Sequence, residues 1–187
     1  MSVIWIVLGG AAALFAFIVL IYNSLVAARQ LSENGWSDID VQLKRRADLI
    51  PEIVTTVKAY AKHEKTLFAD VTRQRQNALS AGQDPKTRAA AEGLLAAPVS
   101  RLFALAEDYP DLKANENFLL LQNELSETED KIEMARRFYN GAVRELNTKI
   151  QSFPAMLLAA PFGFKSRDYF EIGEMATARP TVEFGDA

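Results

Sequence analysis

The decapeptide YPDLKANENF, residues 109–118, is dense in groups that could bind a metal ion. Asp111 offers a carboxylate and Asn115 an amide oxygen, and Ca²⁺ binds such oxygens in the EF-hand loop. Counted from Asp111, however, Glu116 stands where that loop needs glycine, and Gln122 stands where it needs a bidentate glutamate. We therefore do not expect calcium to bind here.

The same decapeptide fits a structural joint between two helices. Pro110 ends the preceding helix, because proline disfavours the helical conformation of the residue before it, here Tyr109. Asn115 lies three residues before Phe118, where its side chain can cap the first turn of a following helix. We predict structural roles for Tyr109, Pro110 and Asn115.

A second cluster of carboxylates follows on the last predicted helix. Its members are Glu124, Glu127, Glu129, Asp130 and Glu133. Four-helix proteins that hold metals through carboxylates need Glu-x-x-His pairs on two helices. The only histidine in the sequence, His63, has no glutamate three residues before it. We predict a solvated acidic face and no metal site.

Other catalytic chemistry finds little support in the sequence. There are no cysteines, which excludes disulfides, thiolate metal sites and thiol nucleophiles. His63 lies among charged residues and is interpreted as a surface side chain. No nucleophile elbow, phosphate loop, zinc spacing or dinucleotide fingerprint occurs. We predict no catalytic residue, no cofactor and no enzyme activity, and the formal charge of -3 gives no reason to expect nucleic acid as a partner.

The elements that position these residues begin with an apolar segment. No side chain from Ser2 to Ala28 is charged, and this run is long enough to cross a hydrocarbon core of about 30 Å as a helix. A cleaved signal peptide is the alternative, but the start of the run lacks Lys and Arg and the run is longer than usual. We predict that residues 1–28 form a transmembrane helix.

The charges that flank this segment indicate its orientation. Arg29 and then Lys44, Arg45 and Arg46 follow the apolar run, and no basic side chain precedes it. The positive-inside rule therefore places the N-terminus outside and the rest of the chain in the cytoplasm. Gly9 and Gly10 could let another helix approach closely, but without a small-xxx-small pair of glycines we prefer a lipid-facing helix.

Residues 29–153 are predicted to form a bundle of long helices. Apolar residues recur at helical spacing from Trp36 to Val71, with Pro51 inside the pattern, so the chain either kinks or begins a new helix there. Asp84 and Pro85 predict the cap and first turn of a helix that runs to about Glu107. Residues 115–152 keep a near-heptad, coiled-coil-like spacing. No strand pattern competes, so the predicted class is all-α.

Two groups of polar residues flank the apolar seams of these helices. They are Arg45, Arg46 and Asp48 beside Pro51, and Arg136, Tyr139 and Asn140 beside Glu129 on the last helix. Charged and amide groups beside such a seam often fix the register of facing helices. Our hypothesis is a structural polar network, with ordinary solvated side chains as the alternative.

The C-terminal tail, residues 154–187, begins within an apolar stretch. The sequence FPAMLLAAPFGF, residues 153–164, is too short to span a membrane and is interrupted by Pro154, Pro161 and Gly163. It could pack on the bundle, contact the membrane surface or contact another subunit. The sequence leaves these three alternatives open.

Taken together, these motifs resemble the LemA family of bacterial membrane proteins over residues 22 to about 170. The motifs that carry the resemblance are YNSLV, WSDIDVQLKRRADLIPEIV, YPDLKANENFLLLQNEL, TEDKIEMARRFYNGAV and FP followed by an apolar tail. The resemblance implies one helix in the bacterial inner (plasma) membrane and a cytoplasmic antiparallel four-helix bundle, which favours a turn at Pro51. It implies no catalytic residue, because none is established for the family.

The resemblance also maps three family motifs onto this sequence. The corresponding residues are Arg46, Asp48, Leu49, Ile50 and Pro51, then Tyr109, Pro110, Leu112 and Asn115, and finally Glu129, Arg136, Tyr139 and Asn140.

These observations favour a non-enzymatic scaffold or adaptor that is anchored in the membrane. Its expected partners are the lipid bilayer, further copies of itself in a homo-oligomer, and other inner-membrane proteins. The alternative is a ligand- or peptide-binding regulator with a polar pocket near Arg45, Arg46, Tyr139 and Asn140. An enzyme whose site is built from Glu, Asp, Lys, Arg and Tyr is a third hypothesis, and it has the least support.

Overall fold

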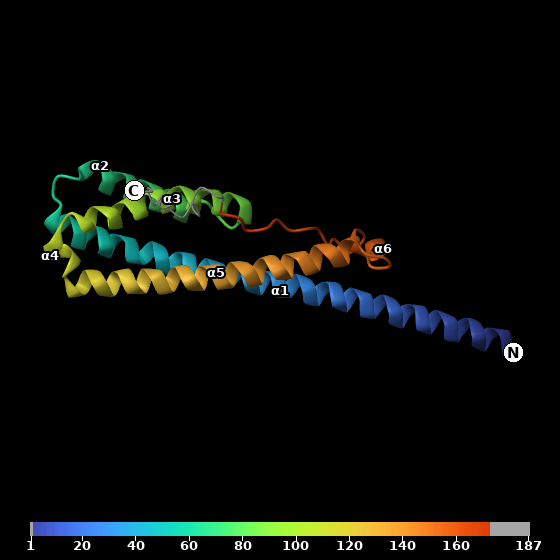
Figure 1. Ribbon diagram of the computed structural model, residues 1–187. Coiled ribbons are helices and arrows are strands. Elements are labelled where there is room, and N and C mark those ends of the chain that lie inside the picture. Colours follow the sequence, from blue (N-terminus) through green and yellow to red (C-terminus); the bar gives the residue numbers. More distant parts are fainter. Residues whose placement is uncertain (1, 173–187) are drawn as a thin grey trace, which may run out of the picture. The chain divides into compact units, whose positions relative to one another are not determined.

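The computed structural model describes residues 2–172, which form helices and connecting segments without a strand (Figure 1). The helices are α1 (Ser2–Tyr60), α2 (Lys65–Ser80), α3 (Pro85–Glu107), α4 (Pro110–Lys113), α5 (Glu116–Gln151) and α6 (Met156–Ala159). The predicted all-α class is confirmed, and α3 and α5 begin and end within one residue of their predicted limits. The antiparallel four-helix arrangement stays a prediction.

The contacts of the chain divide it into two compact units. Among the described residues, the first unit contains 2–40 and 132–169, and the second contains 41–131 and 170–172. Helices α1 and α5 each contribute one part to each unit. The predicted domain limits after residues 28 and 153 stay predictions.

Helix α1 continues through Pro51 and ends at Tyr60, so the predicted turn at Pro51 is wrong. Proline has no N–H to donate to the carbonyl of Ala47, one turn earlier. The guanidinium of Arg75, on α2, donates its Nε hydrogen to this carbonyl instead. A donor from a neighbouring helix thus replaces the hydrogen bond that proline removes. The helix ends later, and residues 61–64 connect α1 to α2.

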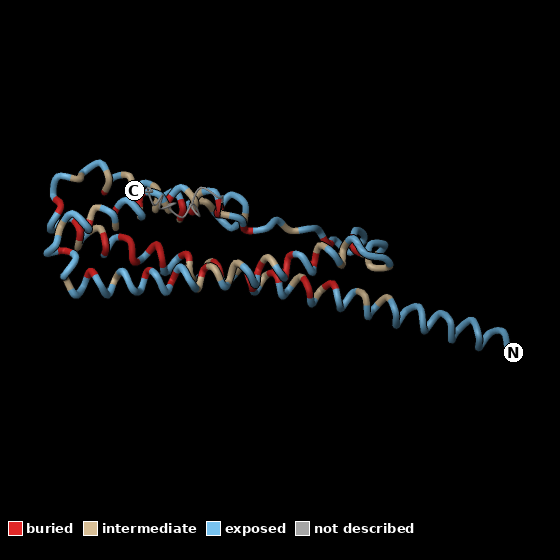
Figure 2. Tube along the Cα trace, in the orientation of Figure 1, coloured by how far each residue is buried: buried red, intermediate tan, exposed pale blue. Residues whose placement is uncertain are grey.

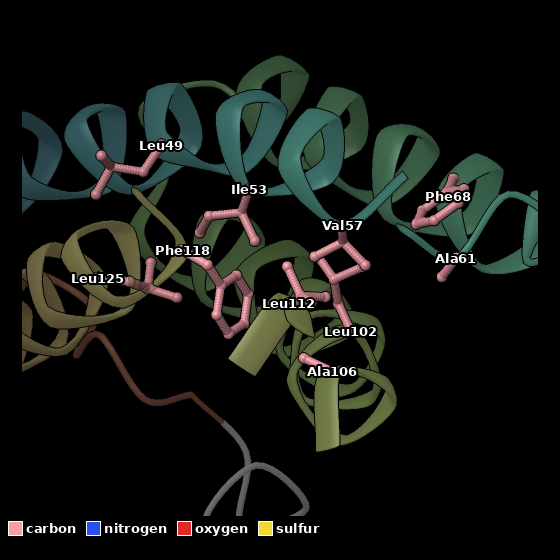
Figure 3. Packing of buried hydrophobic residues seen from close by; sticks show 10 residues of the cluster. All are labelled: Leu49, Ile53, Val57, Ala61, Phe68, Leu102, Ala106, Leu112, Phe118 and Leu125. Atoms are coloured by element: carbon pink, nitrogen blue, oxygen red, sulfur yellow. The ribbon is translucent and has the colours of Figure 1, made fainter. Parts of the chain in front are cut away.

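The core of the second unit joins all five of its helices (Figure 3). Ile53 and Val57 of α1 are completely buried, and Leu102 of α3, Leu112 of α4 and Phe118 of α5 belong to the same cluster. The remaining buried members are Leu49, Ala61, Phe68, Ala106 and Leu125. Helix α4 therefore helps to build the core, although it has only four residues.

Both predicted N-terminal caps are present. A carboxylate oxygen of Asp84 accepts hydrogen bonds from the backbone N–H of Thr87 at 2.8 Å and from the Thr87 hydroxyl at 2.5 Å. The side-chain oxygen of Asn115 accepts from the backbone N–H of Phe118 at 3.0 Å, and its amide donates to the hydroxyl of Tyr60 at 3.2 Å. The decapeptide 109–118 is thus the joint between α3 and α5.

The cap of α3 makes a prediction about pH. The two hydrogen bonds from Thr87 lower the pKa of Asp84 below its ordinary value. A carboxylate whose folded pKa is lowered stabilises the folded state above its unfolded pKa, and this contribution is lost as the pH falls through the folded pKa. In an NMR titration, Asp84 should therefore titrate below the usual value of about 3.9. Thr87→Val should raise its pKa, and an unchanged value would contradict this account of the cap.

Within the first unit, α1 and α5 are in close contact at Gly35. A Cβ atom at this position would lie 3.0 Å from the Cα atom of Tyr139 and 3.1 Å from Cδ1 of Phe138. Real Cβ atoms rarely come this close to another heavy atom, and the backbone of Tyr139 cannot rotate away. Glycine is needed here for close packing of two helices.

We therefore expect Gly35→Ala to lower the free energy of unfolding by about 1–2 kcal/mol, because an overpacked contact outweighs the better helix propensity of alanine. Gly141→Ala is the matched control, since a Cβ at Gly141 would meet nothing within 4 Å. That change should stabilise the protein by about 0.5–1 kcal/mol. Denaturant unfolding of the full chain would measure both, and equal effects of the two changes would rule out the proposed contact.

Candidate functional site

A cluster of four charged side chains, three of them buried, links three helices of the second unit. Nη1 of Arg46, on α1, donates to Oε1 of Glu129, on α5, at 2.8 Å, and Nη2 donates to Oε2 of Glu92, on α3. The Nε hydrogen of Arg88, also on α3, is donated to the other carboxylate oxygen of Glu92 at 2.9 Å. The side chains of Arg46 and Glu92 are only 6% and 2% exposed. We call Arg46, Arg88, Glu92 and Glu129 the charge cluster.

Electrostatics favour the ionised form of Arg46. Burial is the largest single influence on the pKa of Arg46 and lowers it, but Glu129 and Glu92 together raise that pKa above its ordinary value. Both oxygens of Glu92 are engaged by guanidinium groups. The cluster can therefore tie α1, α3 and α5 together, but it leaves Glu92 poorly placed to bind a metal or to accept a proton from a substrate.

The other predicted site residues near Pro51 lie at the surface. Arg45 and Asp48 are exposed, and a carboxylate oxygen of Asp48 lies 3.8 Å from Nη2 of Arg75.

Pro110 begins α4, and Tyr109 is half-buried against the core of the second unit. Of the predicted polar residues, the structure thus joins Arg46 to Glu129, and the wider network stays a prediction.

The remaining predicted residues lie in the first unit. Tyr139 is buried, its hydroxyl donates to the carbonyl oxygen of Asp168 at 2.9 Å, and its ring centre lies 5.6 Å from that of Trp36. Arg136 and Asn140 are half-buried on the same helix. The groups of Arg46 and Tyr139 that the regulator hypothesis needs are therefore engaged within the protein itself.

Three polar residues that make internal contacts were not predicted from the sequence. Arg88 and Glu92 stand at the same helical spacing as the buried Leu95 and Leu102, so they occupy core positions of α3. This spacing was the available signal. Asn147 was missed as well: its side chain donates to the carbonyl of Arg167 at 3.0 Å and accepts from the backbone N–H of Arg167 at 2.9 Å.

The acidic residues of α5 do not form a metal site in the described part of the chain. Glu124, Glu127 and Asp130 are exposed and Glu133 is half-buried, and no three His, Asp or Glu side chains between residues 2 and 172 are placed to hold one ion. Glu127 and Glu133 instead form surface ion pairs with Lys131 and Arg137.

The other functional feature is the uncovered start of α1. Residues 2–20 are exposed apart from the half-buried Ile18 (Figure 2). This stretch is long and apolar enough to cross a membrane, and none of its most apolar window is buried. Helix α3 meets the same criteria of length and composition, but a third of its apolar window is buried. The start of α1 is the stronger candidate for a membrane span.

Comparison with known proteins identifies the family. The sequence model of the LemA family matches residues 35–184, which is most of the chain. This chain belongs to the LemA family. The match begins after the uncovered part of α1 and includes the charge cluster, so the membership predicted from the sequence motifs is confirmed.

Curated relatives agree with this assignment. Magnetosome protein MamQ 2 of Paramagnetospirillum magneticum is 24% identical over 184 residues, which cover 85% of this chain and 68% of that protein. Magnetosome protein MamQ of Magnetospirillum gryphiswaldense is similar at 24% identity over 186 residues, 84% of this chain and 68% of the relative. Protein LemA of Metamycoplasma hominis is 24% identical over 153 residues, 82% of this chain and 70% of the relative. Similarity therefore extends over most of each protein.

Proposed function

We propose that this LemA-family chain is a non-enzymatic scaffold, anchored in the bacterial inner membrane by α1 and assembled from several copies. In this proposal the N-terminus lies outside and the bundle lies in the cytoplasm. Other inner-membrane proteins bind to the assembly.

The proposal rests on two features of α1, an apolar start that is uncovered and a C-terminal part that is buried in a protein core. Its first residues are apolar and uncovered, which suits contact with lipid. Its last residues, including Ile53 and Val57, form the core of the second unit. One helix of 59 residues therefore serves as anchor and as structural element. The buried charges support a structural role, because Arg46 and Glu92 bind each other in place of a substrate.

The second unit also offers a surface for a further copy of the chain. Leu120 of α5 is 61% exposed, and Leu119 beside it is exposed as well. Leu120 lines a shallow groove with Pro51, Thr55 and Leu121. An apolar side chain beside a groove is suited to contact between proteins, because association removes it from water. We assign this surface to contacts between copies.

Cross-linking tests this assignment directly, because the chain has no cysteine of its own. Leu120→Cys, oxidised in native membranes, should give a disulfide-linked dimer of the full chain. Gln122→Cys is the control, since this exposed residue points away from Leu120 on the same helix. Dimer formation at Gln122 equal to that at Leu120, or no dimer at Leu120, would count against the assigned surface.

A further inference from the structure

The apolar stretch 153–164 folds onto α1 where the apolar part of α1 ends. Ala159 and Phe164 are buried in a cluster with Leu25 of α1. The ring of Tyr22 lies 5.1 Å from that of Phe162 and 5.7 Å from that of Phe164, measured between ring centres. These contacts lie within the first unit and attach the stretch to residues 21–29 of α1.

The side chain of Arg29, on α1, contacts the same apolar stretch. The guanidinium carbon of Arg29 lies 5.2 Å from the ring centre of Phe164, in the geometry of a cation–π contact. The segment that follows residue 164 is bound to α5, because the side chain of Asn147 makes hydrogen bonds to the backbone of Arg167. It is also bound to α1, because Nη2 of Arg167 donates to Glu33 at 2.7 Å. Both ends of the stretch are therefore fixed, because it begins where α5 ends and is followed by this anchored segment.

The opposite side of the stretch has no cover in the described structure. Phe153, Met156 and Leu157 are exposed, and Leu157 is 61% exposed. From 153 to 164 no side chain carries a charge or a hydrogen-bonding group. A contiguous apolar surface of this kind usually marks contact with a membrane or another protein.

The length of α1 indicates which of these two it is. Residues 2–20, uncovered except for Ile18, span roughly 28 Å at about 1.5 Å per residue, close to a hydrocarbon core of about 30 Å. The apolar stretch packs immediately after them, beside Tyr22 and Arg29. Tyrosine and arginine are the side chains that favour the membrane interface. The stretch therefore lies beside the end of the uncovered segment of α1.

We propose that residues 153–164 form an interfacial anchor, which inserts Phe153, Met156 and Leu157 into the lipid at the end of the α1 span. Insertion would be shallow, because the stretch is too short and too interrupted to cross the bilayer. This inference rests on the proposed membrane span of α1, and it adds a second lipid contact made by the C-terminal part of the chain.

Depth-dependent fluorescence quenching tests the interfacial anchor. The full chain, with the single substitution Leu157→Cys and an environment-sensitive dye on that cysteine, is reconstituted in phosphatidylcholine–phosphatidylglycerol vesicles. The dye should lose most of its fluorescence with lipids brominated near the headgroup end of the acyl chain, and less with lipids brominated near the terminal methyl. Met156→Cys should behave in the same way, which guards against a local disturbance at Leu157.

Two reference positions separate this inference from the membrane span itself. Leu14→Cys reports on α1 and should be quenched best by deep bromines, whereas Lys113→Cys, on α4, should not be quenched. If Leu14 is quenched and Leu157 and Met156 are not, the anchor is disproved and the span stands. If emission at Leu157 instead changes with the protein-to-lipid ratio, a second copy covers the stretch and the anchor is wrong. If Leu14, Leu157 and Met156 are all unquenched, the span and the anchor both fail.

Discussion

Glu92→Gln should lower the free energy of unfolding by about 3–5 kcal/mol, the usual cost of leaving buried charges without their partner. Glu92 accepts hydrogen bonds from Arg46 and Arg88, and all three side chains are buried. Glutamine has nearly the same shape but no charge, so both guanidinium groups lose an anion while the packing is preserved. A loss of this size should lower the apparent Tm of the full chain in detergent by roughly 6–20 °C.

Two control variants distinguish buried from exposed charges. Glu129→Gln removes the other partner of Arg46, but this side chain is 47% exposed, so its loss should cost about 1 kcal/mol or less. Lys131→Gln breaks a surface pair with Glu127 and should cost less than about 0.5 kcal/mol. If all three variants had equal Tm values, the charge cluster would not contribute to stability as proposed.

A triple variant tests the physical reason for the effect. Arg46→Met, Arg88→Met and Glu92→Leu together remove the buried charges and keep apolar volume at these positions. Replacing a buried ion pair by apolar residues is often neutral or stabilising. We therefore expect the triple variant to recover most of the stability that Glu92→Gln loses. A triple variant as unstable as Glu92→Gln would contradict unpaired charge as the reason for the loss.

The second large effect concerns the apolar part of α1. Ala12→Arg and Phe15→Arg together should move the chain from the membrane fraction to the soluble or aggregated fraction. Each arginine near the centre of a span costs about 2.5–3.5 kcal/mol on the insertion scale. Two such residues therefore oppose insertion by about 6 kcal/mol, equivalent to roughly 10⁴ in an equilibrium constant.

Extraction with alkaline carbonate after cell fractionation measures this change. Ala12→Leu with Phe15→Leu is the matched control, and this variant should stay in the membrane pellet. If the interfacial anchor holds the chain at the surface without the span, the arginine variant would be released by carbonate but not by physiological salt. An arginine variant that resists carbonate and still floats with the membranes in a density gradient would contradict membrane insertion of α1.

The parts of the fold that could be predicted depend on local chemistry. Asp84 and Asn115 cap helices whose first turns follow them directly, so residue type and spacing were sufficient. The continuation of α1 through Pro51 could not be predicted in this way. The donor that replaces the missing N–H comes from Arg75, on another helix, and its contact depends on how the helices pack.

In the candidate sites too, the residues that could not be predicted are those whose contacts come from distant parts of the sequence. Arg46 and Glu129 were singled out beside the helix seams, but Glu92, the buried partner of Arg46, was not, because it lies among alanines on another helix. The place of residues 153–164 was left open, since their contacts are with Tyr22 and Leu25, near the other end of the sequence.

Native mass spectrometry of the full chain, captured from its own membranes in lipid particles, tests the scaffold proposal most directly. One copy of the chain has a mass of 20.8 kDa. The proposal predicts complexes that contain several copies, alone or with a stoichiometric partner protein. Particles that contain a single copy with lipid and no other protein, at physiological abundance, would contradict it.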